Sequence, residues 1–420
     1  MTKFIKIVFY TLLLFSFIYQ YDLTFLGLPS TFHSVRVSGC VIILLALISR
    51  CIYKKQNYGF EKKINKNIKA YFYFIIFLFL YSLLLLIVVG VGQGNYIYEN
   101  LLNILLFSIP VALSLRILIK DIDELCKVLF FTGILQSMII VLCTFNDNFA
   151  LLIDTIFNRN FFEFTREYRH AYAGGIGCIT STGVVRFSTC LFASAYLFLS
   201  SRKNVYLLFF MILSIVACMI ARTGFIFFII GMYVIMSSYF SAKSIIKIIL
   251  SLISCSVIIL LAISQFISID ELIQLRFNRF ISLNETGLRK GFFDGYFYGE
   301  DTYLPPLNLD TILGTGLLSG LSADGYKVHV DGGPLRIYSA IGLPMCLFSY
   351  FFVLNIMFRL LKICKGSVNR KMLGMFVIFI LVSDFKEISL FSVWPMCLYF
   401  TISYFIISKE SINNESITCY

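Results

Sequence analysis

Long runs of apolar residues, separated by short polar connections, dominate the chain. They lie at about 4–20, 38–53, 70–92, 97–118, 125–145, 183–200, 205–221, 224–240, 245–264, 336–358, 372–385 and 388–408. Each run is near the ~20 residues that a helix needs to cross the ~30 Å hydrocarbon core of a bilayer. The pattern therefore predicts about twelve transmembrane helices.

The apolar stretch 205–240 is too long for one crossing. Its 36 residues would extend about 54 Å as a single helix at ~1.5 Å per residue. Arg222, Thr223 and Gly224 interrupt it with a charge and a glycine. We therefore expect two helices that meet in a hairpin at this point.

The composition agrees with a membrane protein. Of the 420 residues, 59% are hydrophobic and 14% are charged, whereas a soluble globular domain is about half apolar and about a quarter charged. The net charge of +12 would suggest a nucleic-acid partner in a soluble protein, but here we interpret it as a topology signal. The predicted fold class is an all-α polytopic integral membrane protein, a single bundle over residues 1–420 with no nucleic-acid partner.

The basic residues predict the orientation of the bundle, because cytoplasmic loops carry an excess of Lys and Arg. With both termini in the cytoplasm, 22 of the 35 basic residues fall inside and 17 of the 23 acidic residues fall outside. The inner segments then carry a net charge of +16 and the outer segments −4. The twelve-span arrangement thus satisfies the positive-inside rule.

Arginine is concentrated on the predicted outer side. Of the 22 inner basic residues 17 are Lys, whereas 10 of the 13 outer ones are Arg. A guanidinium group binds phosphate or carboxylate through two parallel hydrogen bonds. The excess of outer arginine therefore favours an external anion site. The alternative is that these arginines pair with outer Asp and Glu within the loops. The outer arginines are Arg36, Arg159, Arg166, Arg169, Arg186, Arg222, Arg276, Arg279, Arg289 and Arg336.

Two external loops are large enough to carry function. The first, 146–182, contains Arg166 and Arg169, and the second, 265–335, lies between the ninth and tenth predicted spans. Within the second loop, residues 269–281 place apolar side chains at helical spacing. This pattern predicts a short interfacial amphipathic helix with Arg276 and Arg279 near the headgroups.

Several polar residues next to predicted spans are candidates for chemistry. Arg222 sits at a membrane border, where a charged side chain is functional by default; the alternative is an arginine that only marks the turn. His329 and Asp331 precede the tenth span, and either could act as a general base on a hydroxyl group. Alternatively, Asp331 is the N-cap of a helix that opens at Pro334; both roles are compatible.

Two further patterns bear on a possible turn and on a possible metal site. GTGLLSG at 314–320 predicts a tight turn that glycine permits. The three histidines, His33, His170 and His329, are all external, but nothing fixes their spacing as metal ligands. We therefore expect neither a metal nor another cofactor.

These motifs resemble those of the O-antigen polymerase (Wzy) family, within the O-antigen polymerase and ligase superfamily. ARTGFIF at 221–227 is similar to the Arg-Ser/Thr start of a span, and GLRKGFF at 287–293 to a Gly-Arg segment early in the large loop. GTGLLSG and VHVDGGPLRIYSAIGLP at 328–344 resemble its Gly-x-Gly turn and the segment that opens the next span. The motifs cover some 40 residues, whereas the architecture covers most of the chain.

The resemblance implies a metal-independent glycosyltransferase of the bacterial cytoplasmic (inner) membrane. It would join repeat units carried on undecaprenyl pyrophosphate into O-antigen or capsule-type polysaccharide on the outer face. Its partners would be the lipid-linked glycan donor and acceptor, the bilayer, and a chain-length regulator protein. Arg222 and Arg289 would hold the pyrophosphate leaving group, and His329 or Asp331 would orient or deprotonate the acceptor hydroxyl.

Two alternatives remain open. An O-antigen ligase typically carries His followed by Asn or Ser at this place, whereas here Val330 and Asp331 follow His329, which is closer to the polymerase pattern. A flippase for lipid-linked oligosaccharide, or another transporter, would concentrate charges within its helices and keep its loops short. The nearly charge-free spans and the long second loop argue against transport.

Overall fold

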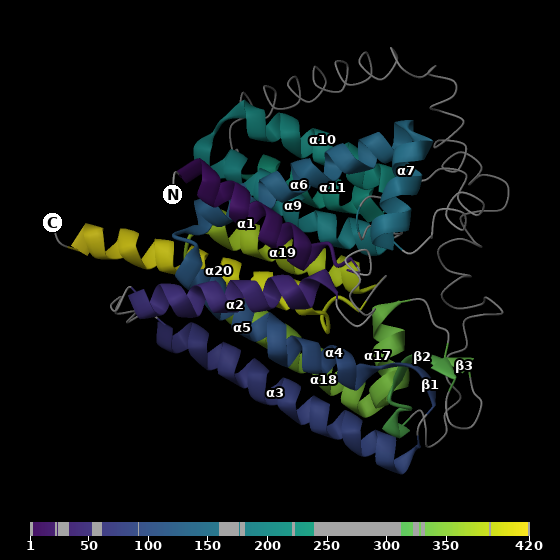
Figure 1. Cartoon of the computed structure of the whole chain (residues 1–420). Helices are drawn as coiled ribbons and strands as arrows, with labels where there is room; N and C mark the ends of the chain where they lie inside the picture. The colour runs from purple at the N-terminus through teal and green to yellow at the C-terminus, as the bar shows by residue number, and fades with distance from the viewer. Residues whose placement is uncertain are drawn as a thin grey trace. The chain divides into compact units, whose positions relative to one another are not determined.

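The computed structural model describes residues 3–21, 23, 33–52, 61–90, 92–158, 176, 181–220, 223–238, 312–321, 327–328, 332–385 and 388–418. Most of them are helical, as Figure 1 shows. The chain folds into two compact units. Unit 1 comprises Met1–Ser38 and Asp123–Gly287, and unit 2 comprises Gly39–Ile122 and Leu288–Tyr420.

Six helices of the described part are long and apolar enough to cross a membrane, namely those at Ser34–Cys51, Ile64–Val88, Ile97–Leu118, Ile122–Phe145, Gly183–Ser201 and Leu343–Ile363. Shorter apolar helices occur at Phe4–Ile18, Asn148–Phe157, Asn204–Cys218 and Thr223–Ser237. The chain is therefore a predominantly helical, multi-pass membrane protein. The number twelve stays a prediction, and the span expected at 245–264 lies outside the described residues.

Unit 1 is built around one helix that is almost completely buried. The described elements are α1 (Lys3–Ile18), α6 (Ile122–Phe145), α7 (Asp147–Ile153), the π-helix η3 (Asp154–Asn158), α9 (Ser181–Ser201), α10 (Asn204–Ile220) and α11 (Thr223–Ser237). The apolar window of α9 is 94% buried, and α10 and α11 both pack against it. Helix α9 therefore forms the core of this unit.

The hairpin expected in the stretch 205–240 is confirmed. Helix α10 ends at Ile220 and α11 begins at Thr223. A Cβ atom at Gly224 would lie 2.5 Å from the main-chain oxygen of Ala217, and one at Gly231 would lie 2.5 Å from the ring of Phe210. The two glycines thus allow the two helices to pack closely together.

Unit 2 contains the remaining described helices and a small sheet. The elements are α2 (Ser34–Ile52), α3 (Glu61–Val88), β1 (Gln93–Tyr96), α4 (Ile97–Asn103), η2 (Ile104–Ser108), α5 (Ile109–Leu118), β2 (Leu317–Leu321), β3 (Lys327–Val328), α17 (Gly333–Ile341), α18 (Leu343–Ile363), α19 (Ser367–Asp384) and α20 (Val393–Thr418). The first residues of α2 belong to unit 1. Helix α20 packs against α5 and α19, and α18 packs against α3.

The three strands form an antiparallel sheet in the order β1-β2-β3. Gly94 pairs with Gly320, which in turn pairs with Val328. The sheet joins segments more than 200 residues apart in the sequence and was not expected in an all-α protein. It is small and leaves the helical architecture unchanged.

Two differences from the predicted elements concern one expected span and one expected loop. The expected span 336–358 is two helices, α17 and α18, which are separated at Gly342 (φ 77°). Pro334 and Pro344 stand at the starts of these helices, where a missing N–H is tolerated. The loop expected at 146–182 begins with α7 and η3, and the amphipathic helix expected at 269–281 lies outside the described residues.

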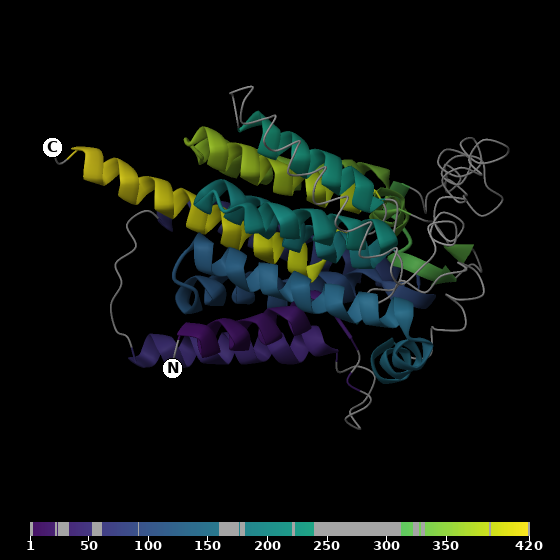
Figure 2. The ribbon, with the colours of Figure 1, turned by 90° about the horizontal axis from the view of Figure 1, so that it is seen from above.

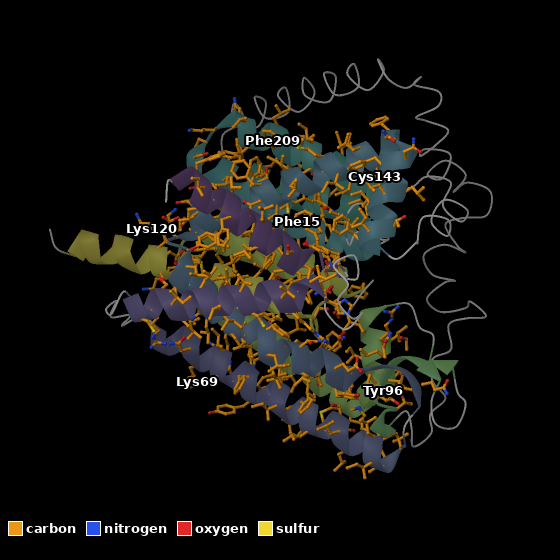
Figure 3. The ribbon with its side chains drawn as sticks, viewed as in Figure 1. Phe15, Lys69, Tyr96, Lys120, Cys143 and Phe209 are labelled. Carbon is orange, nitrogen blue, oxygen red and sulfur yellow. The ribbon has the colours of Figure 1, made fainter. Side chains whose placement is uncertain are left out.

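The two ends of unit 2 differ in charge. Figure 3 labels Lys69 and Lys120 at one end and Tyr96 at the other. Figures 1 and 2 place the sheet and α17 opposite the C-terminal end of α20. Lys and Arg gather where α3 and α19 begin and where α2, α5 and α18 end. We name these two ends the basic end and the sheet end. The positive-inside rule predicts that the basic end is cytoplasmic, and this orientation stays a prediction.

Candidate functional site

A turn at the sheet end holds the last residues of α17. The amide N–H of Thr315 donates to the main-chain oxygen of Ser339 (2.9 Å), and that of Gly316 donates to Ala340 (2.8 Å). The hydroxyl of Thr315 also donates to Ser339, at 3.1 Å. The final carbonyl groups of a helix have no partner within it, so the turn supplies the hydrogen bonds that α17 itself cannot make.

The expected glycine turn is confirmed at its first three residues. Gly314 and Gly316 adopt φ values of 95° and 75°, which glycine tolerates because it has no Cβ. The residues that follow, from Leu317, form strand β2. Tyr81 of α3 also contacts this segment. Its hydroxyl donates to the main-chain oxygen of Leu313, just before the turn, at 2.6 Å.

The connection between β3 and α17 contains two of the predicted catalytic residues. His329 and Asp331 lie outside the described residues, but the chain is anchored on both sides of them. Strand β3 ends at Val328, which pairs with Gly320, and α17 begins at Gly333. The connection therefore contains only residues 329–332, between a paired strand and a helix whose far end is fixed.

Helix α17 carries Arg336, the one predicted substrate-binding residue that the structure describes. Its side chain is half-buried, one turn from the start of the helix. The residue at the N-cap position is Gly332, with φ 114° and no side-chain capping bond. The suggestion that Asp331 caps this helix is therefore wrong, because the helix begins one residue later than that role requires.

A buried carboxylate also lies at the sheet end. Asp384, the last residue of α19, is 1% exposed. One carboxylate oxygen accepts hydrogen bonds from the amide groups of Ser389 and Leu390, both at 2.8 Å. The other accepts from the hydroxyl of Tyr350 in α18, at 2.5 Å. Asp384 thus ties the α19–α20 connection to α18.

Unit 1 holds a separate buried polar cluster around Arg186. This arginine lies in α9, is 9% exposed, and donates to the side-chain oxygen of Gln20 at 3.2 Å. One turn further along α9, the Sγ of Cys190 lies 3.5 Å from the hydroxyls of both Tyr19 and Thr132. The cluster therefore joins α9 to α6 and to the residues that follow α1.

Gln136 of α6 extends this cluster. It lies one turn after Thr132, is fully buried, and donates its amide to the main-chain oxygen of Ile176 at 3.0 Å. The helices approach closely here, because a Cβ atom at Gly133 would lie 2.5 Å from that of Cys190. A charged side chain such as Arg186 in this position is rare in membrane helices and marks a candidate functional residue.

The basic end of unit 2 is held by a carboxylate as well. Glu410 of α20 accepts hydrogen bonds from the amide groups of Lys365 (2.7 Å) and Gly366 (2.9 Å) and from the side chain of Asn369 (3.0 Å). Partial burial alone would raise the pKa of Glu410, but these hydrogen bonds outweigh it and the pKa is lowered. Burial and the neighbouring Glu410 raise the pKa of the Cys364 thiol to about 12. Glu410 therefore supplies acceptors to the amide groups just before α19 and so helps to cap the start of that helix.

Most of the predicted site residues lie outside the part of the chain that the structure describes. These are Arg166, Arg169, Arg222, Arg276, Arg279, Arg289, His329 and Asp331. Their grouping around one anion therefore stays a prediction. Among the described residues, no group of three or more His, Cys, Asp or Glu side chains is suited to hold a metal ion.

Three buried charged residues of the described part were not among the predicted site residues, although a signal for each is present in the sequence. Arg116, Arg186 and Asp384 fall inside the apolar runs 97–118, 183–200 and 372–385. A charge within a predicted span is by itself a reason to suspect a functional or structural role. The expectation of nearly charge-free spans therefore needs this correction.

The chain matches no protein-family model, no curated protein and no solved structure.

Proposed function

We propose that this protein polymerises oligosaccharide repeat units carried on undecaprenyl pyrophosphate, at the outer face of a bacterial cytoplasmic membrane. The reaction transfers the growing glycan from its lipid carrier to a hydroxyl group of one lipid-linked repeat unit. The O-antigen polymerase family, which the sequence motifs resemble, performs this chemistry. The sheet end of unit 2 would face the side on which the polysaccharide is made.

The observation that supports this proposal is that the chain is held on both sides of residues 329–331, by the pairing of β3 before them and by α17 after them. A general base must be held within hydrogen-bonding reach of the proton that it removes. The pairing of β3 with β2, and the bonds from Thr315 and Gly316 to α17, fix the elements on either side of the segment that contains His329 and Asp331. A rigid support of this kind suits a catalytic segment better than a freely exposed loop.

Each proposed role follows from the charges that the reaction moves. The acceptor oxygen forms a bond to the anomeric carbon and loses its proton to His329 or Asp331. The bond from that carbon to the pyrophosphate oxygen breaks, and the electron pair leaves with undecaprenyl pyrophosphate. Arg222 and Arg289 would stabilise the charge that develops on this leaving group. Arg336 on α17 would contribute a further guanidinium next to the catalytic segment.

A flippase or another transporter is the second candidate, and one observation favours it. Asp384 and Arg186 are buried within helical units, and transporters place charged side chains in such positions. The long connection 265–335 and the arginine-rich outer loops favour the polymerase. A ligase that transfers the glycan to lipid A–core is the third reading.

Deletion of the gene and gel analysis of the surface polysaccharide distinguish these functions. A strain without the polymerase retains lipid A–core that carries a single repeat unit and lacks longer chains. Loss of all glycan from lipid A–core would identify a ligase. Accumulation of lipid-linked units on the cytoplasmic face would identify a flippase and would overturn the proposal.

A further inference from the structure

Helices α3 and α18 of unit 2 pack side by side, and each carries both basic residues and exposed aromatic residues. We propose that the seam between these two helices binds an anionic phospholipid, with its phosphate at Lys66 and Arg359 and its acyl chains against the exposed rings. The inference does not depend on the proposed polymerase activity. It rests on the contacts between the two helices and on the positions of their exposed side chains.

Three contacts show that α3 and α18 run antiparallel. The ring of Phe74 stacks on that of Phe352, with centroids 4.2 Å apart, and its centroid lies 5.9 Å from that of Phe348. The hydroxyl of Tyr81, seven residues later in α3, donates at 3.5 Å to the main-chain oxygen of Ile341, just before α18 begins. Moving forward along α3 therefore means moving backward along α18.

This register brings one basic residue of each helix to the same height. Lys66 lies eight residues before Phe74, which is about 12 Å along the helix at ~1.5 Å per residue. Arg359 lies seven residues after Phe352, about 11 Å in the same direction. Both side chains are exposed, so two cations lie at nearly the same height toward the basic end of the seam.

The exposed apolar face of α3 continues from Lys66. Tyr73, Phe77 and Leu84 follow it after 7, 11 and 18 residues, which is close to two, three and five whole turns of a helix with ~3.6 residues per turn. Their side chains are 66%, 47% and 55% exposed. One leaflet of the hydrocarbon core is about 15 Å thick. A lipid whose phosphate lies at Lys66 therefore has its acyl chains beside Tyr73 and Phe77.

Helix α18 has the same arrangement in the opposite direction. Phe348 lies 11 residues before Arg359, and Phe348 and Phe351 are 48% and 70% exposed. Because Phe348 also contacts Phe74, the seam itself opens to the surface. The Nε of Arg359 donates to the side-chain oxygen of Asn355 at 3.2 Å. This bond orients the guanidinium, whose two terminal nitrogens are the atoms that bind a phosphate in parallel.

The charge of both segments favours an anion. Residues 53–70 contain six Lys and one Glu, and residues 355–371 contain five Lys or Arg and no acidic residue. These counts include every residue of the two segments, so they hold also for 53–60, which lie outside the described residues. Basic surfaces between transmembrane helices bind anionic headgroups. A phosphodiester with one net negative charge therefore fits this seam better than a zwitterionic headgroup.

Lipid titration of the purified protein tests the proposal. We would remove bound lipid from the full-length protein in detergent and add dioleoylphosphatidylglycerol or dioleoylphosphatidylcholine, counting bound molecules by native mass spectrometry. The two lipids have the same acyl chains and differ in headgroup charge. Each basic contact near a membrane surface contributes roughly fivefold in affinity, so we expect the anionic lipid to bind on the order of twentyfold more tightly.

Two variants separate the headgroup contacts from the acyl-chain contacts. The double substitution Lys66→Gln and Arg359→Gln should abolish the preference for the anionic lipid, and each single substitution should reduce it roughly fivefold. Phe351→Ala should weaken the binding of both lipids and leave the preference unchanged. All three residues are exposed, so we expect the variants to fold, and their Tm without added lipid would show this.

A matched control removes two charges of the basic end outside the seam. Arg50 and Lys120 are exposed and lie on neither α3 nor α18. The double substitution Arg50→Gln and Lys120→Gln lowers the net charge by the same amount and should keep the lipid preference.

Four results would overturn the proposal. Equal affinity for both lipids in the wild type would show that the seam does not select a charged headgroup. An equal loss in the control pair would assign the preference to net charge alone. Displacement of the lipid by an equal concentration of glycerol 3-phosphate would identify a site for a free anion instead. Unaltered binding in Phe351→Ala would contradict the position of the acyl chains.

Discussion

The hydroxyl of Tyr81 donates a hydrogen bond to the main-chain oxygen of Leu313, 2.6 Å away and 232 residues later in the chain. This bond joins α3 to the turn that holds the end of α17. Helix α17 carries Arg336 and comes directly after the proposed catalytic segment. Under the proposed function, Tyr81 would therefore affect the chemistry near α17 without touching the substrate.

Replacing Tyr81 by Phe removes this bond and keeps the ring. We expect a loss of about 0.5–1.5 kcal/mol in the free energy of unfolding, the usual net contribution of one hydrogen bond, together with shorter polysaccharide chains. Thermal unfolding of the purified variant and a polysaccharide gel would measure the two effects. Tyr73→Phe on the same helix is the matched control, because Tyr73 is 66% exposed. Equal effects of both variants would contradict the positioning role of Tyr81.

Replacing Gly342 by Ala should damage the break between α17 and α18. A Cβ atom at this position would overlap the main-chain oxygen of Ile312, and the φ of 77° is unfavourable for other residues. Strain of this kind costs roughly 1–3 kcal/mol, so we expect a lower Tm and less folded protein after size-exclusion chromatography. Gly374→Ala in α19 should be tolerated, because its Cβ would be 3.9 Å from the nearest atom, in Leu361.

Replacing Glu410 by Gln should destabilise the basic end of unit 2 at neutral pH. The pKa of Glu410 is lower in the folded protein than its ordinary value of 4.5. The carboxylate therefore contributes stability above the unfolded-state pKa, and this contribution is lost as the pH falls through the folded-state value. The difference in Tm between wild type and Glu410→Gln should be constant from pH 7 to pH 6 and decrease below about pH 4.5. A difference that grew with acidity would contradict this assignment.

Replacing Arg222, Arg289 or Arg336 by Lys should reduce polymerisation while the protein still inserts into the membrane. Lysine keeps the charge but not the planar fork that binds a phosphate through two bonds. The chain length of the polysaccharide on gels, with membrane levels of the protein measured in parallel, would show the loss. Arg50→Lys, an exposed residue at the basic end, is the control. Wild-type chain length in all three variants would end the proposed role of these arginines.

The sequence by itself determined which segments are apolar helices and where the basic residues gather. Helices α10 and α11 meet at the predicted hairpin, because the length of an apolar run and the glycine that interrupts it are local properties. The lysines and arginines at one end of unit 2 follow from the same pattern, since loop charge sets orientation. None of this needs knowledge of which distant segments meet.

Only the tertiary structure decided which polar groups within the bundle meet. Arg186 contacts Gln20, Asp384 contacts Tyr350, and β1 pairs with β2 across more than 200 residues. The break between α17 and α18 at Gly342 likewise depends on a distant segment, because the residues at 313–316 pack against it. A hydrogen-bond partner in an apolar interior is set by the packing of distant helices, and hydrophobic periodicity carries no information about which helices pack together.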